Sequence, residues 1–210
     1  MTPTNGSCAS QSLPVVLITG YGLFRDFSTN SSKEVVEQLG KVGIENIDLR
    51  TEILPVEYNQ VKRRSQELFE KHQPILTVHC GMHSKAHAVV LEQKARNSGY
   101  DAADVQGQLP ENNCCMSCAS PEFLTTSLDL EAIAAQIGKG ISMPVYISRD
   151  AGNYLCEFIY YCSLSRCRRT LFVHFPHLSS EFTLEGLANT LKRIVVIAVA
   201  QCIRHSENNQ

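Results

Sequence analysis

The sequence has no block of basic residues, no long uninterrupted apolar run and no apolar core near its N-terminus. Its 210 residues carry a formal net charge of −2, with 19 basic residues scattered among 21 acidic ones. This pattern argues against nucleic acid or an anionic membrane surface as the main partner. The longest apolar run, Ile194 to Ala200, is far shorter than the ~20 residues of a membrane span. The polar segment Met1 to Gln11 lacks the apolar core of a secretory signal, so we expect a cytosolic protein.

The nine cysteines lack any spacing that indicates a disulfide framework, and their number is odd. In a chain of this length without an export signal, we expect reduced thiols. Three of them, Cys114, Cys115 and Cys118, lie close together and raise the alternative of a zinc site. A structural zinc site needs four ligands, usually as two close pairs, and no second pair lies at a suitable distance. We therefore interpret these three as free thiols in a surface loop and expect no metal.

The turn Gly20-Tyr21-Gly22, after the first apolar run, lacks the third glycine of a dinucleotide-binding fingerprint. Arg25 occupies that position, and no helix is predicted directly after the turn. A phosphate cradle needs strand, turn and helix in close succession. We interpret the segment instead as a tight turn into a substrate loop that presents Tyr21, Phe24 and Asn30, and we expect no cofactor.

What the chain does have is 43% hydrophobic residues and an alternation of strand-like and helix-like segments. Short apolar or alternating runs predict strands at 13–19, 47–56, 75–79, 86–91, 144–147 and 171–175. Helical spacing of apolar residues predicts helices at 32–41, 57–72, 130–137, 151–164 and 183–203. This alternation indicates an α/β fold, with a mostly parallel twisted central sheet and helices on both faces, an open α/β/α sandwich. We expect a single domain over 13–206 behind a flexible tail, 1–12, with a long polar loop at 98–121.

The residue types that carry out thiol chemistry occur at the ends of predicted elements. Cys156 follows the turn signal Asp150-Ala151-Gly152, and if Asp150 caps the helix, Cys156 lies about two turns into it. A helix start lowers a thiol pKa through unpaired N–H groups and positive potential, and this effect weakens two turns in. His174 and Glu92 each end an apolar strand-like run. A cysteine and a histidine so placed are the working parts of a thiol hydrolase, although each residue singly also fits a structural role.

Four segments of the chain, which follow one another in the family's order, resemble pyroglutamyl peptidase type I, a family of cytosolic cysteine peptidases. Tyr154-Leu155-Cys156, after Asp150-Ala151-Gly152, resembles the family's nucleophile segment, and 172–176 resembles its histidine segment. Leu91-Glu92, with Asn97 five residues beyond the glutamate, resembles the segment of the catalytic acid. The stretch 53–58 resembles one that is typical of animal members. The resemblance extends from about Val15 to the last predicted helix.

The fourth segment, 19–24 with Asn30 beyond it, resembles the family's substrate loop and carries most of the departures from the family pattern. The family loop usually reads Thr-Gly-Phe-x-Pro-Phe-Gly, whereas this chain has Tyr21 for Phe, Leu23 for Pro and Arg25 for Gly. Bacterial members also carry an arginine about ten residues after the acid, where this chain has Ala102. We expect these changes to weaken the hold on substrate and to leave the catalytic residues intact.

The resemblance implies a cysteine-type omega peptidase that removes an N-terminal pyroglutamyl residue from peptides. Cys156 would be the nucleophile, His174 the general base and acid, and Glu92 the carboxylate that orients the histidine. Tyr21 and Phe24 would sandwich the flat lactam ring, with Asn30 in the same loop. Two alternatives stay open: a relative of the same fold that binds without turnover, and a different hydrolase acting on another small amide. The sequence also leaves open whether the protein is a monomer or a homo-oligomer.

Overall fold

A computed structural model describes residues 12–24, 28–139 and 143–207, so all but the last residue of the predicted tail lies outside it. Its centre is a six-stranded sheet in the order β2-β1-β3-β8-β4-β7. These strands are β1 (Val15–Tyr21), β2 (Asp48–Leu54), β3 (Leu76–Met82), β4 (Val89–Glu92), β7 (Val145–Ser148) and β8 (Thr170–Phe175). Neighbouring strands are parallel except β4 and β8, which are antiparallel. The predicted α/β fold with a mostly parallel sheet is confirmed.

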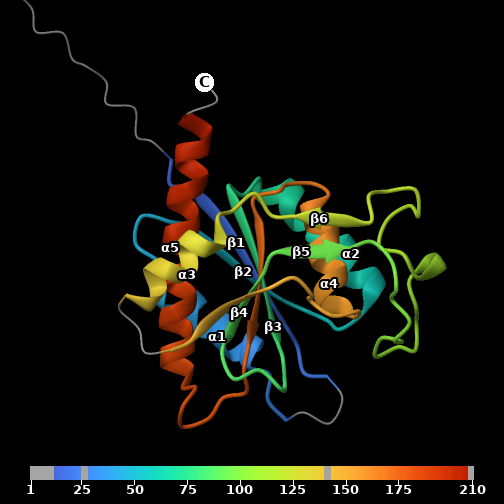
Figure 1. The fold of residues 1–210 in the computed structure, drawn as a ribbon, viewed down its shortest axis with the longest axis horizontal. Helices are drawn as coiled ribbons and strands as arrows, with labels where there is room; N and C mark the ends of the chain where they lie inside the picture. The colour runs from blue at the N-terminus through green and yellow to red at the C-terminus, as the bar shows by residue number, and fades with distance from the viewer. Residues whose placement is uncertain (1–11, 25–27, 140–142, 208–210) are drawn as a thin grey trace, which may run out of the picture.

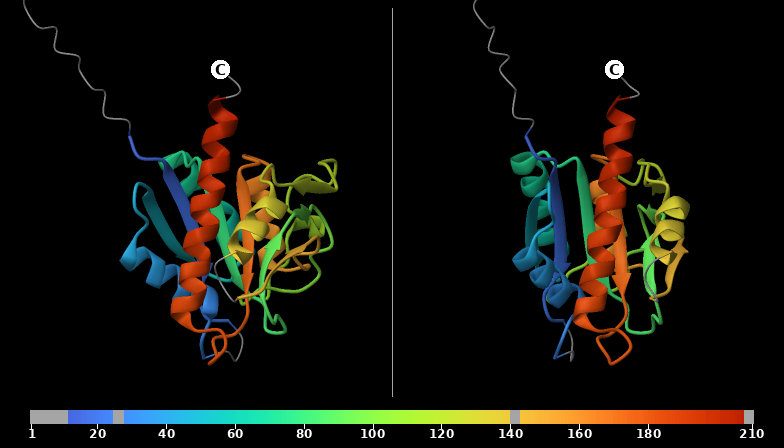
Figure 2. Two further views of the ribbon diagram at one scale, coloured as in Figure 1. Left: turned by 60° about the vertical axis from the view of Figure 1, so that its left-hand side comes forward. Right: turned by 90° about the vertical axis from the view of Figure 1, so that its left-hand side faces the viewer.

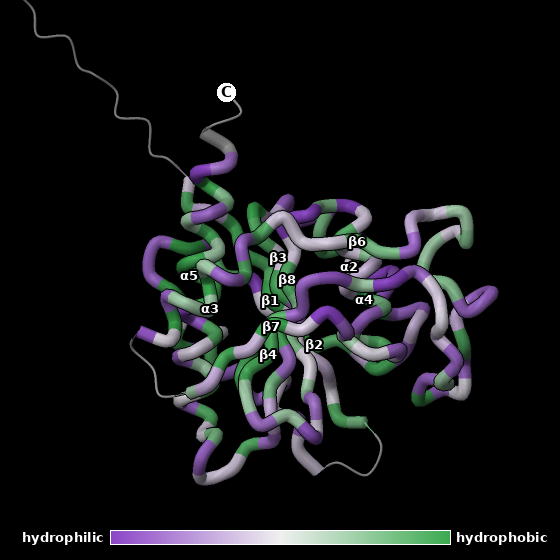
Figure 3. The backbone as a smooth tube through the Cα atoms, viewed as in Figure 1, coloured by the Kyte–Doolittle hydropathy of each residue, from purple (hydrophilic) through white to green (hydrophobic). Residues whose placement is uncertain are grey.

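Helices cover both faces of the sheet (Figures 1 and 2). One face carries α1 (Ser31–Val42), α3 (Leu130–Gly138) and α5 (Leu184–Glu207), and the other carries α2 (Tyr58–His72) and α4 (Leu155–Leu164). Each face has its own apolar cluster, so the central strands contribute side chains to both. Figure 3 shows this as hydrophobic colour along β3 and β8. The sheet is therefore buried on both sides, as expected for parallel strands joined by helices.

Helix α5 is long and apolar enough, over Leu184–His205, to cross a membrane by length and composition alone. The sequence predicts a helix at 183–203, but a search for uninterrupted apolar runs does not mark it as a span, because charged residues interrupt its apolar ones. In the fold, 56% of the apolar window is buried. Leu187, Leu191, Ile194 and Val195 pack into the core with α1 and the sheet. The apolar side of α5 is therefore used to close one face of the sheet.

A small second sheet lies outside the central one and was not predicted. It pairs β5 (Lys94–Arg96) with β6 (Phe123–Thr125) in antiparallel orientation. Strands of three residues are too short to show an alternating pattern, which explains why the sequence did not indicate them. Between them runs the predicted long loop, interrupted by a short 3-10 turn, η1 (Glu111–Asn113). Asn97 anchors the loop, because its side chain donates to the Ser117 carbonyl and accepts from the Met116 N–H.

The cysteines of this loop do not all lie at its surface, contrary to our expectation. Cys118 is exposed, but Cys114 and Cys115 are buried. The sulfur of Cys115 lies 2.9 Å from the sulfur of Cys162 in α4 and 3.2 Å from the carbonyl oxygen of Phe158. The loop thus packs by one thiol against the helix that also carries Cys156, a contact between distant segments that cysteine spacing could not reveal.

Candidate active site

The helix that carries Cys156 begins later than predicted. It starts at Leu155, with Tyr154 as N-cap, and not at Ala151. Gly152 has a φ of 91°, in the left-handed region that favours glycine. The Asp150 carboxylate accepts a hydrogen bond from the Gly152 N–H at 3.2 Å and does not cap the helix. The expectation that Cys156 lies two turns in was therefore wrong: it is the second residue of the helix, where unpaired N–H groups and the positive dipole end act in full.

The Cys156 thiol lies against the backbone of β3 at Gly81. A Cβ atom placed on Gly81 would be 2.9 Å from the sulfur of Cys156 and 2.9 Å from Cζ of Phe172. In the sheet, Gly81 pairs with His174 of β8. The absence of a side chain at Gly81 therefore lets the thiol approach the strand beside the histidine. The role of Gly81 was not predicted, because the predicted strand ends at residue 79 whereas β3 continues to Met82.

His174 and Glu92 are joined by a buried hydrogen bond. Nδ1 of His174 lies 2.8 Å from Oε1 of Glu92, and the two residues are only 4% and 2% exposed. Val90 of β4 pairs with His174, so Glu92, two residues on, is a diagonal neighbour on the same face of the sheet. The Tyr160 hydroxyl donates to the Glu92 backbone oxygen at 2.7 Å. The carboxylate can accept from Nδ1–H, which leaves Nε2 of the imidazole for the thiol.

The environment of His174 favours its protonated form. Burial lowers its pKa, but the charge interaction and hydrogen bond with Cys156, together with those with Glu92, outweigh burial and raise the pKa to about 9. An imidazole with this pKa holds a proton at neutral pH, and Cys156 and Glu92 are the two neighbours that stabilise its charged form. The structure thus brings the three predicted catalytic residues together, in an arrangement suited to moving a proton from thiol to imidazole.

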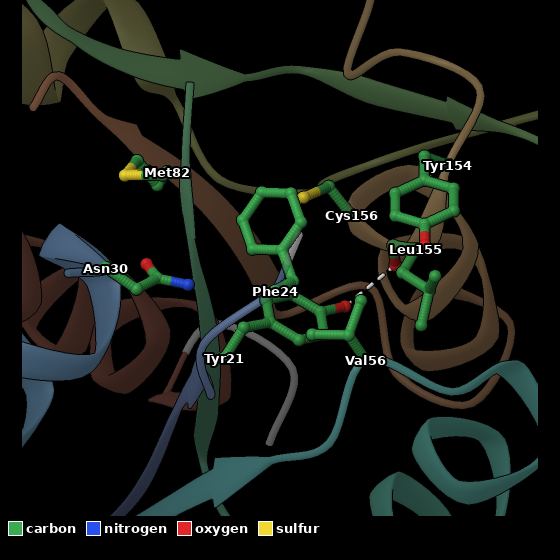
Figure 4. A pocket seen from close by; sticks show the side chains of 8 residues that line it. All are labelled: Tyr21, Phe24, Asn30, Val56, Met82, Tyr154, Leu155 and Cys156. Carbon is green, nitrogen blue, oxygen red and sulfur yellow. Dashed lines mark hydrogen bonds between the residues drawn. The ribbon is translucent and has the colours of Figure 1, made fainter. Parts of the chain in front are cut away.

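A mostly apolar pocket opens beside the thiol (Figure 4). It is lined mainly by aromatic and aliphatic side chains and exposes little polar surface. Its lining combines the three predicted substrate-binding residues with the nucleophile and four others: Tyr21, Phe24, Asn30, Val56, Met82, Tyr154, Leu155 and Cys156. The sequence did not indicate Val56, Met82, Tyr154 or Leu155 as lining residues, although Tyr154 and Leu155 directly precede the nucleophile, because residue type alone does not show which side chains face a pocket.

The substrate loop is held in place by its own polar groups. Asn30 caps α1 by accepting from the Ser32 N–H, and its amide donates to the Gly22 carbonyl at 2.9 Å. Asn30 therefore ties the start of α1 to the turn that carries the lining residue Tyr21. Tyr21 is only 4% exposed, and its hydroxyl donates to the Leu155 carbonyl at 2.7 Å. Of the other departures from the resembled pattern, Leu23 is 55% exposed and Arg25 lies outside the described residues.

Comparisons with known proteins agree on one family. The sequence profile described as pyroglutamyl peptidase matches residues 15–197. The chain is 38% identical to rat pyroglutamyl-peptidase 1 over 183 residues, 86% of this chain and 87% of the relative. It is 37% identical to human pyroglutamyl-peptidase 1-like protein over 163 residues, 75% of this chain and 82% of that one.

Solved structures give the same picture. Pyrrolidone carboxyl peptidase from Fervidobacterium islandicum superposes with a TM-score of 0.78 at 26% identity, covering 87% of this chain and 96% of that one. The enzyme from Thermococcus litoralis gives a TM-score of 0.82 over 94% of this chain and 96% of that one. Because the sequence identity to the Thermococcus litoralis enzyme is 18%, this superposition supports the fold alone.

Proposed function

The chain belongs to the pyroglutamyl peptidase family, and we propose that it hydrolyses the amide bond after an N-terminal pyroglutamyl residue of peptides, through a Cys156–His174–Glu92 triad. The observation that carries this proposal is the thiol of Cys156 at a helix start, paired with His174 and facing the apolar pocket. His174 is in turn hydrogen-bonded to Glu92 at 2.8 Å. Nucleophile, base and orienting carboxylate are the three parts that an acyl transfer by a thiol requires.

The reaction begins with attack of the Cys156 sulfur on the carbonyl carbon that joins pyroglutamate to the next residue. His174 holds the thiol proton and delivers it to the leaving amine when the carbon–nitrogen bond breaks. Water, activated by the same imidazole, then hydrolyses the thioester and releases pyroglutamate. Glu92 stabilises the charged imidazole and holds it in the useful orientation throughout.

The negative oxygen of the tetrahedral intermediate needs donors, and the start of α4 supplies them. The first N–H groups of a helix have no partner within it. No side chain of the described residues caps α4, and the Phe158 N–H donates to the Tyr154 carbonyl in its first turn. Within the described residues the N–H of Cys156 has no hydrogen-bond partner, so it can act as this donor beside its own sulfur. Such a donor contributes about 10²- to 10³-fold to turnover in acyl-transfer enzymes.

The pocket favours a lactam over a free amino terminus. Pyroglutamate presents a small, flat and uncharged ring, and Tyr21 and Phe24 are the aromatic side chains that would hold it. A charged amine would lose its hydration among these mostly apolar side chains without gaining a counter-charge. This difference in desolvation supports selectivity for peptides that begin with pyroglutamate.

The decisive assay compares two amides of one fluorescent amine. We expect release of the amine from the pyroglutamyl amide and none from the prolyl amide, which has a charged ring nitrogen and no ring carbonyl. If neither amide were cleaved while the pyroglutamyl amide still protected Cys156 from alkylation, the protein would be a binding-only relative. Cleavage of both amides would indicate a different specificity for the same catalytic residues.

Glu92→Gln should lower kcat strongly and leave KM within a few-fold. The amide keeps the shape but removes the negative charge that stabilises imidazolium, and a comparable change in a serine protease triad costs about 10⁴-fold in turnover. The raised pKa of His174 means that the imidazolium is present below about pH 9 and is lost above it. Because Glu92 is one cause of that raised pKa, the alkaline limb of kcat/KM should move to lower pH in the variant.

The matched control for this substitution is Glu111→Gln, a removal of charge at an exposed position of the long loop. Steady-state kinetics of the three proteins between pH 6 and 10 make the comparison. If Glu92→Gln raised KM alone, Glu92 would be a substrate-binding residue and the triad assignment would be incorrect.

We also propose a cytosolic location. A thiol nucleophile and the close pair Cys115 and Cys162 both keep their reduced form in a compartment buffered by glutathione.

A further inference from the structure

The hydroxyl group of Tyr21 has a partner in the helix of the nucleophile. Tyr21 ends β1 and is almost fully buried, and its hydroxyl donates to the carbonyl oxygen of Leu155 at 2.7 Å, as the dashed line in Figure 4 shows. The two residues are 134 positions apart in the sequence. Since the resembled loop pattern has phenylalanine here, this link between the substrate loop and α4 depends on an atom that the usual residue lacks.

The accepting carbonyl belongs to the same peptide unit as the N–H of Cys156. Because a peptide unit is planar and rigid, whatever fixes the Leu155 carbonyl also fixes the direction of the Cys156 N–H. Within the helix, the carbonyl can accept one bond from four residues further on, and its second lone pair is free for the tyrosine. The hydrogen bond from Tyr21 acts at the first two residues of α4, where a helix frays most easily. No side chain of the described residues caps this end of the helix.

We propose that Tyr21 is a positioning residue whose hydroxyl, through the Leu155–Cys156 peptide, holds the Cys156 N–H in place as the donor to the developing oxyanion. This inference rests on the proposed thiol-peptidase function. The hydroxyl is engaged by Leu155, so only the ring of Tyr21 is available to the lactam. The two parts of one side chain therefore act on different steps: the ring on binding and the hydroxyl on turnover.

This division reverses one expectation from the sequence. The sequence predicts that Tyr21, as a departure from the resembled loop, weakens the hold on substrate. In the structure the buried hydroxyl makes a hydrogen bond of normal length to the Leu155 carbonyl. Removing the hydroxyl leaves that carbonyl without this donor. We expect Tyr21→Phe alone to be harmful to turnover.

The test uses Tyr21→Phe, with Tyr161→Phe as the matched control. Tyr161 lies on the same helix, and its hydroxyl also donates to a backbone carbonyl, that of Pro121. Two inhibitors separate the steps. The Cys156 thiol adds to the aldehyde analogue of pyroglutamate and forms a tetrahedral adduct. The oxygen of this adduct needs the oxyanion donor. Free pyrrolidone has only the ring and reports on the pocket.

Loss of a whole oxyanion donor costs about 10²- to 10³-fold, so looser alignment of one should cost about tenfold. We expect Tyr21→Phe to lower kcat and to weaken the aldehyde by that factor. KM and pyrrolidone binding should stay within about twofold, since the ring remains. Tyr161→Phe should leave all four quantities unchanged.

Equal kcat and aldehyde affinity in wild type and Tyr21→Phe would overturn the inference. So would weaker pyrrolidone binding to the same extent, which would place the hydroxyl in the ring pocket, or an equal loss of kcat in Tyr161→Phe, which would indicate general weakening of α4. If the wild type itself released no amine from pyroglutamyl amides, the proposed function would fail and the inference with it. An active wild type matched by an equally active Tyr21→Phe refutes the inference alone.

Discussion

Cys156→Ala should abolish the release of amine from pyroglutamyl amides while the fold survives. The sulfur is the atom that forms the covalent intermediate, and loss of a catalytic nucleophile costs about 10⁶-fold in a serine protease. The Cys156 side chain is only partly buried, and the smaller methyl group of alanine fits in its place without strain. The thermal midpoint should therefore change little. Steady-state kinetics and a thermal melt on the same preparation give both quantities.

The matched control is Cys167→Ala, which removes another partly buried thiol. A second measurement follows the thiols themselves: iodoacetamide should label Cys156 of the native protein faster than Cys118, although Cys118 is the exposed one. Exposure alone predicts the opposite order, so faster labelling of Cys156 reports its thiolate character. Full activity of Cys156→Ala would end the thiol-hydrolase interpretation.

Most of the fold could be predicted because its signals are local. Each strand of the central sheet shows an apolar or alternating run, and α1 and α3 begin at the capping residues Asn30 and Asp129. The predicted start of α4 was wrong by four residues because an aspartate such as Asp150 can either cap a helix or bond within a turn. Its carboxylate fits a helix cap by sequence, but in the fold it bonds to the Gly152 N–H and to Arg96.

The site was predictable only in part, for a different physical reason. Cys156, His174 and Glu92 stand out by residue type and position, and the fold brings the three side chains close together. Gly81 and the partner of the Tyr21 hydroxyl did not stand out, because each matters through an atom on a distant segment. Close approach and hydrogen bonding between β3, β1 and α4 exist only once the chain has folded.

Gly81→Ala should inactivate the enzyme although none of the three triad residues is substituted, and this is the second large effect that we expect. The new methyl carbon would lie 2.9 Å from the Cys156 sulfur and from Cζ of Phe172, well inside the ~3.5–4.0 Å of comfortable carbon contact. Phe172 is completely buried and cannot yield, whereas Cys156 borders the open pocket. We therefore expect the sulfur to move away from β3 and to lose its position beside His174.

A displacement of about 1 Å at a reacting atom can cost about 10²-fold in rate, so we expect kcat/KM to fall by at least that factor. Overpacking should also lower stability by about 1–3 kcal/mol, and a thermal melt must confirm that the variant is folded at the assay temperature. Gly138→Ala is the control, because a Cβ at that exposed helical position meets nothing within 4 Å.

Since proximity of Cys156 is one cause of the raised pKa of His174, displacement of the thiol should also lower that pKa. The alkaline limb of kcat/KM, which follows loss of the imidazolium, would then shift to lower pH in Gly81→Ala. A folded Gly81→Ala variant with wild-type kcat/KM would mean that the thiol does not rest on β3 when it reacts, and the geometry proposed for the attack would have to be abandoned.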